Sequence, residues 1–457
     1  ASELLYSSFV AGDRPGYRSN HVEVDDLYNV YVIGNTSGSA LPLTPDAFDI
    51  SPNGGIDIFA VKFRPTDLLC NLVNDTDGDG LLDGWEFCGY DQGDDGTIDV
   101  NLPVLGANPY HKDIFIEIDY MKAGPGEAQS HRPHPLAIKM IVDSFAAAPV
   151  NNPDGEPGIY LHVDYGSDAP LTWGQADTWG DLSESDEIMH FETIGSCDDN
   201  GSNFGWDSFN VFKNAYFSEE RAAAFHYNLW GHSLCPSNLS VSGISAGAPA
   251  SDFIVTLGGW KNNTGTINNQ AGTFMHELGH NLGLLHGGDE NENYKPNYLS
   301  VMNYAYQKDG LIINGFESNF DYSYSALPTL NEFALNERDG INLPPLVNGD
   351  IYGARYFCDP GLMEAPVPSI DFDGTTVDWN CDNDSDDLFV IGDINNGQST
   401  ILTGFDDWSN LIFDGGEVGG LGVGETLPEI TVVDELTFEE AQMIPTLYGL
   451  FLPTIVR

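Results

Sequence analysis

The chain contains 457 residues, of which 41% are hydrophobic, and carries 70 Asp and Glu against 16 Lys and Arg, a net charge of −54. This length and composition are typical of a globular protein with several compact units, because single hydrophobic cores stop growing well below this size. The negative charge excludes nucleic acid as a partner, and no apolar stretch of about 18 residues or more predicts a membrane span.

The excess of acidic residues needs a balancing factor, because like charges repel one another in a compact state. Bound divalent cations or a high external salt concentration would reduce this repulsion, and both favour an extracellular setting. A solvated acidic surface without bound cations is the simpler alternative. The chain starts without a basic and apolar leader, which we interpret as a mature product after removal of a signal or pro-segment.

Residues 1–66 predict a small antiparallel β unit, because short alternating runs such as 29–33 lie between Gly, Asn, Asp and Pro turns. Within this unit, residues 28–36, 41–48 and 55–62 resemble one blade of a bacterial β-propeller repeat. A single blade cannot close a propeller. Its strand edges must therefore be covered by the rest of the chain or by another subunit.

Residues 67–110 contain the sequence NDTDGDGLLDGWE, which predicts an EF-hand-like calcium loop. Gly80 stands at position 6 of the loop, where the chain must turn sharply. The predicted ligands are the carboxylates of Asp75, Asp77, Asp79, Asp83 and Glu86 and the carbonyl oxygen of Leu81. Cys70 and Cys88 bracket the loop. An acidic turn without a metal is the alternative.

Residues 111–345 alternate between strand and helix patterns, which predicts an α/β unit with a twisted sheet. The apolar runs predict strands at 111–121, 158–166, 222–234 and 251–260. Helical spacing predicts a helix over 134–149, ended by Pro149, and a second, buried helix over 270–288 that ends in glycines.

The second helix carries the sequence HELGHNLGLLHGG, which predicts a metal site. His276 and His280 lie on one helix face and can bind one cation, and Gly283 can adopt the left-handed conformation that brings His286 back as a third ligand. Three imidazoles leave a tetrahedral zinc ion one position for water, and Glu277 can act as general base for peptide hydrolysis. The alternatives are a helix with ordinary buried histidines and a zinc site used only for folding.

The pattern His-Glu-x-x-His-x-x-Gly-x-x-His resembles the signature of the metzincin zinc endopeptidases. This resemblance implies a methionine turn below the metal, which Ser300–Tyr304 matches with Met302, and a tyrosine that can stabilise the oxyanion, which Tyr304 matches. Residues 106–121 and 407–416 resemble segments of large secreted bacterial metzincin-like proteins. After His286 this chain departs from the well-known families, because Gly287 and Gly288 follow.

The same resemblance implies an α/β (α+β) catalytic domain with a twisted mixed sheet and a zinc-binding helix. The patterns before and after it predict that small β-rich, calcium-binding modules flank this domain. A cleft would separate the sheet from a lower half that follows His286. Residues 224–234 would be the edge strand on which substrate lies, and 327–341 would form a helix of the lower half.

Residues 346–457 predict a C-terminal acidic module that binds a second calcium ion, although no turn glycine is present and a solvated loop is the alternative. Its candidate ligands are Asp378, Asn380, Asp382, Asp384 and Asp393, with Asn395 as a further candidate. The six cysteines allow 15 connectivities, of which pairing between sequence neighbours is the simplest.

Two functions follow as hypotheses. The first is a secreted, extracellular zinc endopeptidase that is stabilised by calcium and cleaves protein or peptide substrates. The alternative is an extracellular structural, adhesive or filament-forming protein that retains such a domain. In that case the N-terminal β unit or the apolar tail 447–457 would mediate self-assembly.

Overall fold

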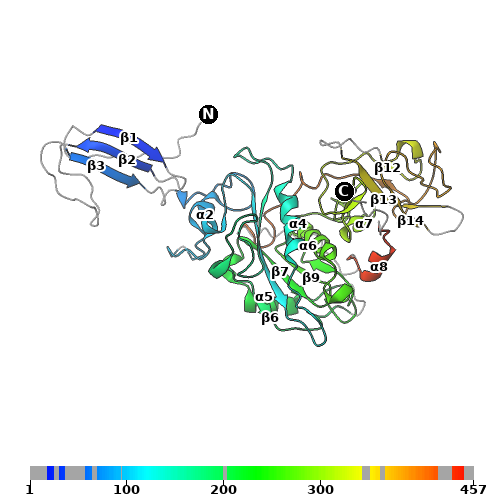
Figure 1. Ribbon diagram of the computed structural model, residues 1–457, viewed down its shortest axis with the longest axis horizontal. Coiled ribbons are helices and arrows are strands. Elements are labelled where there is room, and N and C mark those ends of the chain that lie inside the picture. Colours follow the sequence, from blue (N-terminus) through cyan, green and yellow to red (C-terminus); the bar gives the residue numbers. More distant parts are fainter. Residues whose placement is uncertain are drawn as a thin grey trace, which may run out of the picture.

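The computed structural model describes residues 18–24, 30–36, 57–63, 69–93, 95–198, 203–341, 350–360, 366–419 and 435–446. The fold is mixed α/β, with a mixed six-stranded sheet and few helices (Figure 1). The α/β class expected from the sequence is therefore confirmed at this level. The apolar tail 447–457 and the blade-like segment 41–48 lie outside the described residues.

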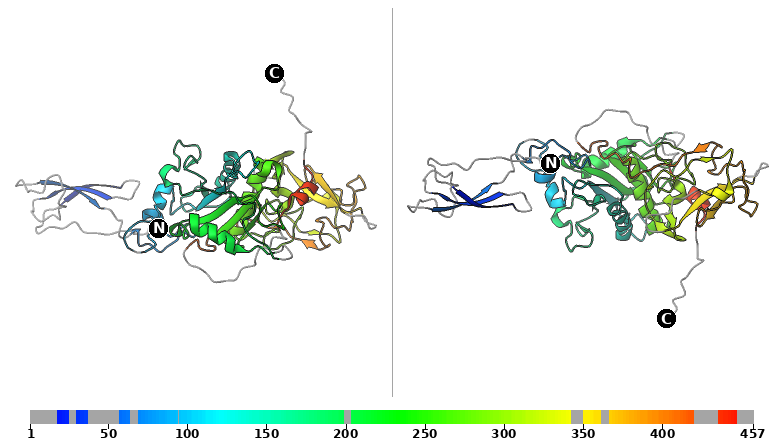
Figure 2. Two further views of the ribbon diagram at one scale, coloured as in Figure 1. Left: turned by 90° about the horizontal axis from the view of Figure 1, so that it is seen from below. Right: turned by 90° about the horizontal axis from the view of Figure 1, so that it is seen from above.

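The N-terminal strands form a separate antiparallel sheet in the order β1-β2-β3. They are β1 (Arg18–Val24), β2 (Val30–Thr36) and β3 (Asp57–Phe63). In Figures 1 and 2 this sheet lies at one end of the molecule. An antiparallel unit is thus present where the alternating runs predict one, while the likeness to a propeller blade stays a prediction.

The large sheet has the order β5-β4-β7-β9-β8, with β6 paired to β4. Its strands are β5 (Tyr160–Asp164), β4 (Asp113–Met121), β6 (Glu187–Ile188), β7 (Phe225–Gly231), β9 (Asp252–Thr256) and β8 (Gly243–Ser245). All of these pairs are parallel except β8 with β9. Each of the four segments predicted as strands forms one strand of this sheet: β4, β5, β7 and β9.

The edge strand was predicted wrongly. Residues 224–234 contain β7, which lies inside the sheet between β4 and β9 and is buried along its whole length. Burial on both faces suits the apolar character of this strand. The antiparallel edge is β8, whose three residues give too short a run to be recognised from sequence.

Two longer helices, α4 (Pro135–Ala146) and α6 (Ile267–Asn281), contact each other, and α6 also contacts β8 and β9 (Figure 1). Helix α6 starts earlier than predicted, at Ile267. It also ends earlier than predicted, because the chain leaves the helix at Leu282. The shorter helices are α2 (Asp83–Cys88), α3 (Leu102–Leu105), α5 (Trp206–Tyr216), α7 (Tyr304–Gln307), α8 (Phe438–Met443), η1 (Gly180–Leu182), η2 (Glu219–Arg221), η3 (Lys261–Asn263) and η4 (Glu337–Asp339).

The segment after α6 forms two small sheets. One has the order β11 (Phe316–Asn319), β10 (Leu311–Ile313), β13 (Tyr352–Cys358) and β14 (Val367–Asp371), and the other pairs β12 (Leu330–Asn331) with β15 (Ile401–Leu402). The α-helix predicted over 327–341 does not form, and the range instead holds β12 and the three-residue η4. The Glu332 carboxylate instead accepts hydrogen bonds from the backbone N–H groups of Ile394 and Thr400, which holds this segment in an extended conformation.

The main hydrophobic core draws on distant parts of the chain. It includes Leu81 of the acidic loop and Leu436, Ala441 and Ile444 near the C-terminus, together with the residues of the large sheet and α6.

The disulfides Cys70–Cys88, Cys197–Cys235 and Cys358–Cys381 join sequence neighbours, as the simplest pairing predicts. These bonds are compatible with an extracellular location.

Basic side chains are scarce, and several are buried. Arg221 is 3% exposed and donates hydrogen bonds to Glu117 of β4 at 2.5 Å and to Asp164 of β5 at 3.0 Å. Lys295 is 0% exposed and Arg355 is 2% exposed. These cations are used to neutralise carboxylates and to bind carbonyl oxygens inside the fold.

Candidate metal centre and active site

Helix α6 carries the first part of the histidine motif, and all three histidines of the motif are buried. The helix begins with a capping box between Thr266 and Asn269, and its residues from Asn269 to Asn281 are buried. Gly283 has φ +89°, a left-handed conformation that a side chain would strain, and its N–H donates to the carbonyl of His280. The chain therefore turns directly after the helix and brings His286 back to the other two histidines.

The imidazoles are oriented by backbone carbonyl groups. Nδ1 of His276 lies 2.9 Å from the carbonyl oxygen of Val301, and Nδ1 of His280 lies 2.7 Å from that of Leu284. These contacts leave the Nε2 atoms of His276 and His280 facing each other at 3.1 Å. A hydrogen bond from the opposite ring nitrogen is the usual way in which a protein orients a metal ligand.

Met302 and Tyr304 lie beside the three histidines. Met302 is fully buried, and a Cβ added to Gly279 of the motif would lie 2.2 Å from its sulfur atom, so the glycine allows helix and methionine to pack closely. The Tyr304 hydroxyl lies 3.2 Å from Nε2 of His286. The segment predicted as a methionine turn is thus placed directly against the helix that carries the ligands.

Glu277 is fully buried, and within the described residues its carboxylate oxygens form no hydrogen bond. Burial, with a further contribution from the negative charge of Glu435, raises the pKa of Glu277 well above its ordinary value. A Cβ added to Gly243 would lie 2.6 Å from Oε1 of Glu277, which places this carboxylate against the edge strand β8. A polar group buried without a partner is costly and is typical of a functional site.

A fourth side chain, the carboxylate of Glu435, completes the cluster and could not be recognised from the sequence. Glu435 lies with one oxygen 3.7 Å from Nε2 of His276 and the other 3.8 Å from Nε2 of His280. One ligand atom from each of His276, His280, His286 and Glu435 lies within 4.8 Å of the others. No local motif marks Glu435, because only the fold brings it to the histidines.

This donor set fits a borderline divalent cation such as zinc, which prefers imidazole and carboxylate ligands. Burial lowers the pKa of His280 to about 4, and burial together with neighbouring imidazoles lowers the pKa values of His276 and His286. The three rings are therefore neutral and able to donate a lone pair to a metal ion.

Glu435 belongs to the segment 435–446, which lies along the edge of the large sheet. The N–H of Ser242 donates to the carbonyl of Leu436 at 3.0 Å, the N–H of Phe438 donates to Ser240 at 3.0 Å, and Val241 pairs with Thr437 in an antiparallel bridge. The segment thus extends the sheet next to β8 as an added strand would.

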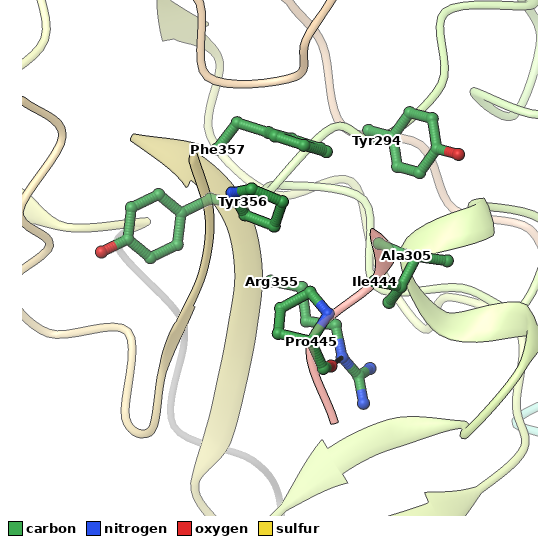
Figure 3. A pocket seen from close by; sticks show the side chains of 8 residues that line it. Tyr294, Ala305, Arg355, Tyr356, Phe357, Ile444 and Pro445 are labelled. Atoms are coloured by element: carbon green, nitrogen blue, oxygen red, sulfur yellow. Dashed lines mark hydrogen bonds between the residues drawn. The ribbon is translucent and has the colours of Figure 1, made fainter. Parts of the chain in front are cut away.

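The far end of this segment is held by two basic side chains. Lys308 donates to the carbonyl of Ala441 at 2.7 Å, and Arg355 donates to the carbonyl of Pro445 at 3.1 Å. Figure 3 shows Ile444 and Pro445 beside Arg355 in a small pocket whose lining also includes Tyr294. Residues 435–446 are therefore bound to the rest of the fold at both ends of the segment.

The acidic loop before β4 brings most of its predicted ligands together. Asp75, Asp77 and Asp79 form one group that could hold a metal ion, and Asp79 and Glu86 form a second group with Asp113. Asp113 starts β4, and its N–H donates to Asp79 at 2.7 Å. Sequence reasoning missed Asp113, because it lies in a strand well beyond the loop.

Asp83 is used differently from its predicted role. Its carboxylate accepts hydrogen bonds from the N–H of Thr76 at 2.8 Å and from the Thr76 hydroxyl at 2.7 Å, and it belongs to neither group. The side chain of Leu81, within the loop, is buried in the main hydrophobic core. Burial and adjacent carboxylates raise the pKa of Glu86 to about 11, and burial raises that of Asp77 to about 7.

The second acidic loop is arranged by backbone turns. Asp378 accepts hydrogen bonds from the N–H groups of Asp382 and Asn383, and Asp382 accepts one from Asp384. Asn380 donates to the carboxylates of Asp382 and Asp387, and Asp393 accepts from Gly397. Over the described range 366–419, no three of these carboxylates converge on a common point.

Comparison of the chain with family models, with curated proteins and with solved structures gives no match. In the part of the chain that the structure describes, no helix combines the length and the apolar character that a membrane span requires.

Proposed function

We propose that the protein is a secreted zinc-dependent endopeptidase of the metzincin type. The observation that carries this proposal is the convergence of His276, His280 and His286 beside the buried carboxylate of Glu277, next to the edge strand β8. The likeness of the motif to metzincins and the placement of Met302 below it support the same conclusion. An edge strand beside a metal centre offers backbone groups to which a peptide substrate can pair.

Each side chain has a role in this proposal. The three histidines hold the zinc ion, which when bound would polarise the scissile carbonyl group and acidify a water molecule. Glu277 accepts the proton of the attacking water and passes it to the leaving amine. The Tyr304 hydroxyl, 3.2 Å from Nε2 of His286, donates a hydrogen bond to the oxygen that becomes negatively charged.

In this proposal, the segment 435–446 blocks the active site, so the conformation described here is an inactive form of the enzyme. Its backbone occupies the edge at 240–242 where a substrate would pair, and Glu435 takes the position next to the histidines that water needs. Displacement of this segment would open the site.

The test is hydrolysis of a denatured protein by the purified full chain and by its Glu435→Ala variant. We expect cleavage that stops when 1,10-phenanthroline removes zinc and returns when zinc is restored. Absence of cleavage by both proteins, each with zinc bound, would contradict the proposal.

We further propose that Asp75, Asp77, Asp79, Glu86 and Asp113 hold calcium, since hard carboxylate oxygens at EF-hand spacing are its preferred ligands. Chelation by EGTA should lower the melting temperature by on the order of 5–10 °C. Without calcium, the carboxylates of the loop and of Asp113 in β4 repel one another, and this repulsion weakens the contact between loop and strand. Calorimetry measures this shift, which calcium but not zinc should reverse. Glu86→Gln should abolish the calcium response, whereas Asp95→Asn, an exposed acid outside the groups, should keep it. A calcium-insensitive melting temperature in the unmodified protein would disprove the site.

A further inference from the structure

A second histidine cluster lies at the carboxyl ends of the parallel strands of the large sheet. Glu127 and His131 follow β4, His190 follows β6, and His232 follows β7. Because β4 pairs in parallel with both β6 and β7, the loops that leave these strands meet at one edge of the sheet. This cluster could not be recognised from the sequence, because its members come from three separate loops without a local motif.

The polar atoms of this cluster point to a missing ligand. Nε2 of His131, both ring nitrogens of His190, Nδ1 of His232 and Oε1 of Glu127 are buried, and none has the geometry of a hydrogen bond with the described residues, although Glu127 lies within ion-pair distance of the imidazoles. Burying this many polar atoms without a hydrogen bond is costly unless another group satisfies them. One ligand atom from each of the four residues lies within 4.8 Å of the others.

The spacing of these atoms suits a single cation at their centre. Glu127 lies with one oxygen 2.8 Å from Nδ1 of His232 and the other 3.3 Å from Nε2 of His131 and 3.9 Å from Nδ1 of His190. The carboxylate is itself fixed by the N–H of Gly124 at 2.6 Å. Ligands that are held by their own hydrogen bonds are typical of metal sites in proteins.

We infer that Glu127, His131, His190 and His232 form a second zinc site, separate from the histidines of α6. Three imidazoles and one carboxylate give zinc a complete tetrahedral shell, which is the arrangement of a structural rather than a catalytic site. The ion fixes the loops after β4, β6 and β7. The loops after β6 and β7 are also linked by Cys197–Cys235 and by backbone hydrogen bonds from Ile194 to Ser233 and from Gly195 to Leu234.

The test counts zinc ions bound per chain by mass spectrometry after loading and desalting of the full-length protein. The proposal predicts that His131→Ala/His190→Ala lowers the zinc content by one ion. His276→Ala/His280→Ala should lower it by one ion independently, so failure of this site and failure of the proposed active site give different counts. His134→Asn, at an exposed histidine of the same loop that caps α4, is the matched control and should keep the full count.

An unchanged zinc content in folded His131→Ala/His190→Ala would overturn the inference. If that variant does not fold, cobalt replaces zinc in the protein that carries Glu127→Gln, and the visible absorption of the tetrahedral cobalt ion is recorded. A shifted or lost cobalt band relative to the unmodified protein supports the site, and an identical spectrum overturns it.

Discussion

Replacing Glu277 with glutamine is expected to lower the rate of peptide hydrolysis by roughly 10²–10⁴-fold, the usual contribution of a general base. The amide keeps the shape of the buried side chain but cannot accept the proton of the attacking water. The zinc content should stay unchanged, because Glu277 is not among the residues that converge on the metal position. The measurement is kcat/KM on a fluorogenic peptide in the Glu435→Ala protein, with zinc counted in the same samples.

Two outcomes would count against this role of Glu277. Full residual activity would show that another group moves the proton. A loss of activity accompanied by a loss of zinc would show that Glu277 supports the metal site and is not the base. Gln442→Ala, at an exposed residue of α8 that is not among the metal-binding side chains, should change neither quantity and serves as the control.

Replacing Glu435 with alanine is expected to raise kcat/KM by on the order of tenfold or more, because a larger fraction of molecules then has an accessible metal position. The three histidines should retain the zinc ion. The measurement compares Glu435→Ala with the unmodified chain and with Gln442→Ala, which lies on the exposed side of α8 in the same segment.

The opposite result would identify a different kind of site. If Glu435 is a permanent fourth ligand of a zinc ion used only for folding, Glu435→Ala should lower the zinc affinity and the melting temperature without producing any hydrolysis. Activity and zinc affinity therefore move in different directions under the two interpretations, and one variant separates them.

The features that could be predicted from sequence are those that depend on neighbours in the chain. The spacing of His276, His280 and His286 predicts a helix that carries the first two, followed by a turn that brings the third back beside them. The structure has this helix and this turn. The strand patterns of β4, β5, β7 and β9 were equally informative, because they are short segments rich in β-branched and aromatic residues. Pairing of neighbouring cysteines was also correct.

The features that were missed depend on contacts between distant segments. Glu435 and Asp113 reach their clusters only through the packing of the whole domain, and nothing in their local sequence marks them. The order of strands in a sheet has the same origin, which is why β7 was mistaken for the edge strand. The helix predicted over 327–341 failed because Glu332 binds a segment more than 60 residues later, at Ile394 and Thr400.

The burial of Arg221, Lys295 and Arg355 also affects how readily proteases can cut the protein. These three belong to a total of 16 basic residues, so the surface offers few sites to enzymes that cut after lysine or arginine. Trypsin-like enzymes need an accessible Lys or Arg, so an acidic surface with few exposed basic side chains would slow digestion of the folded chain by them.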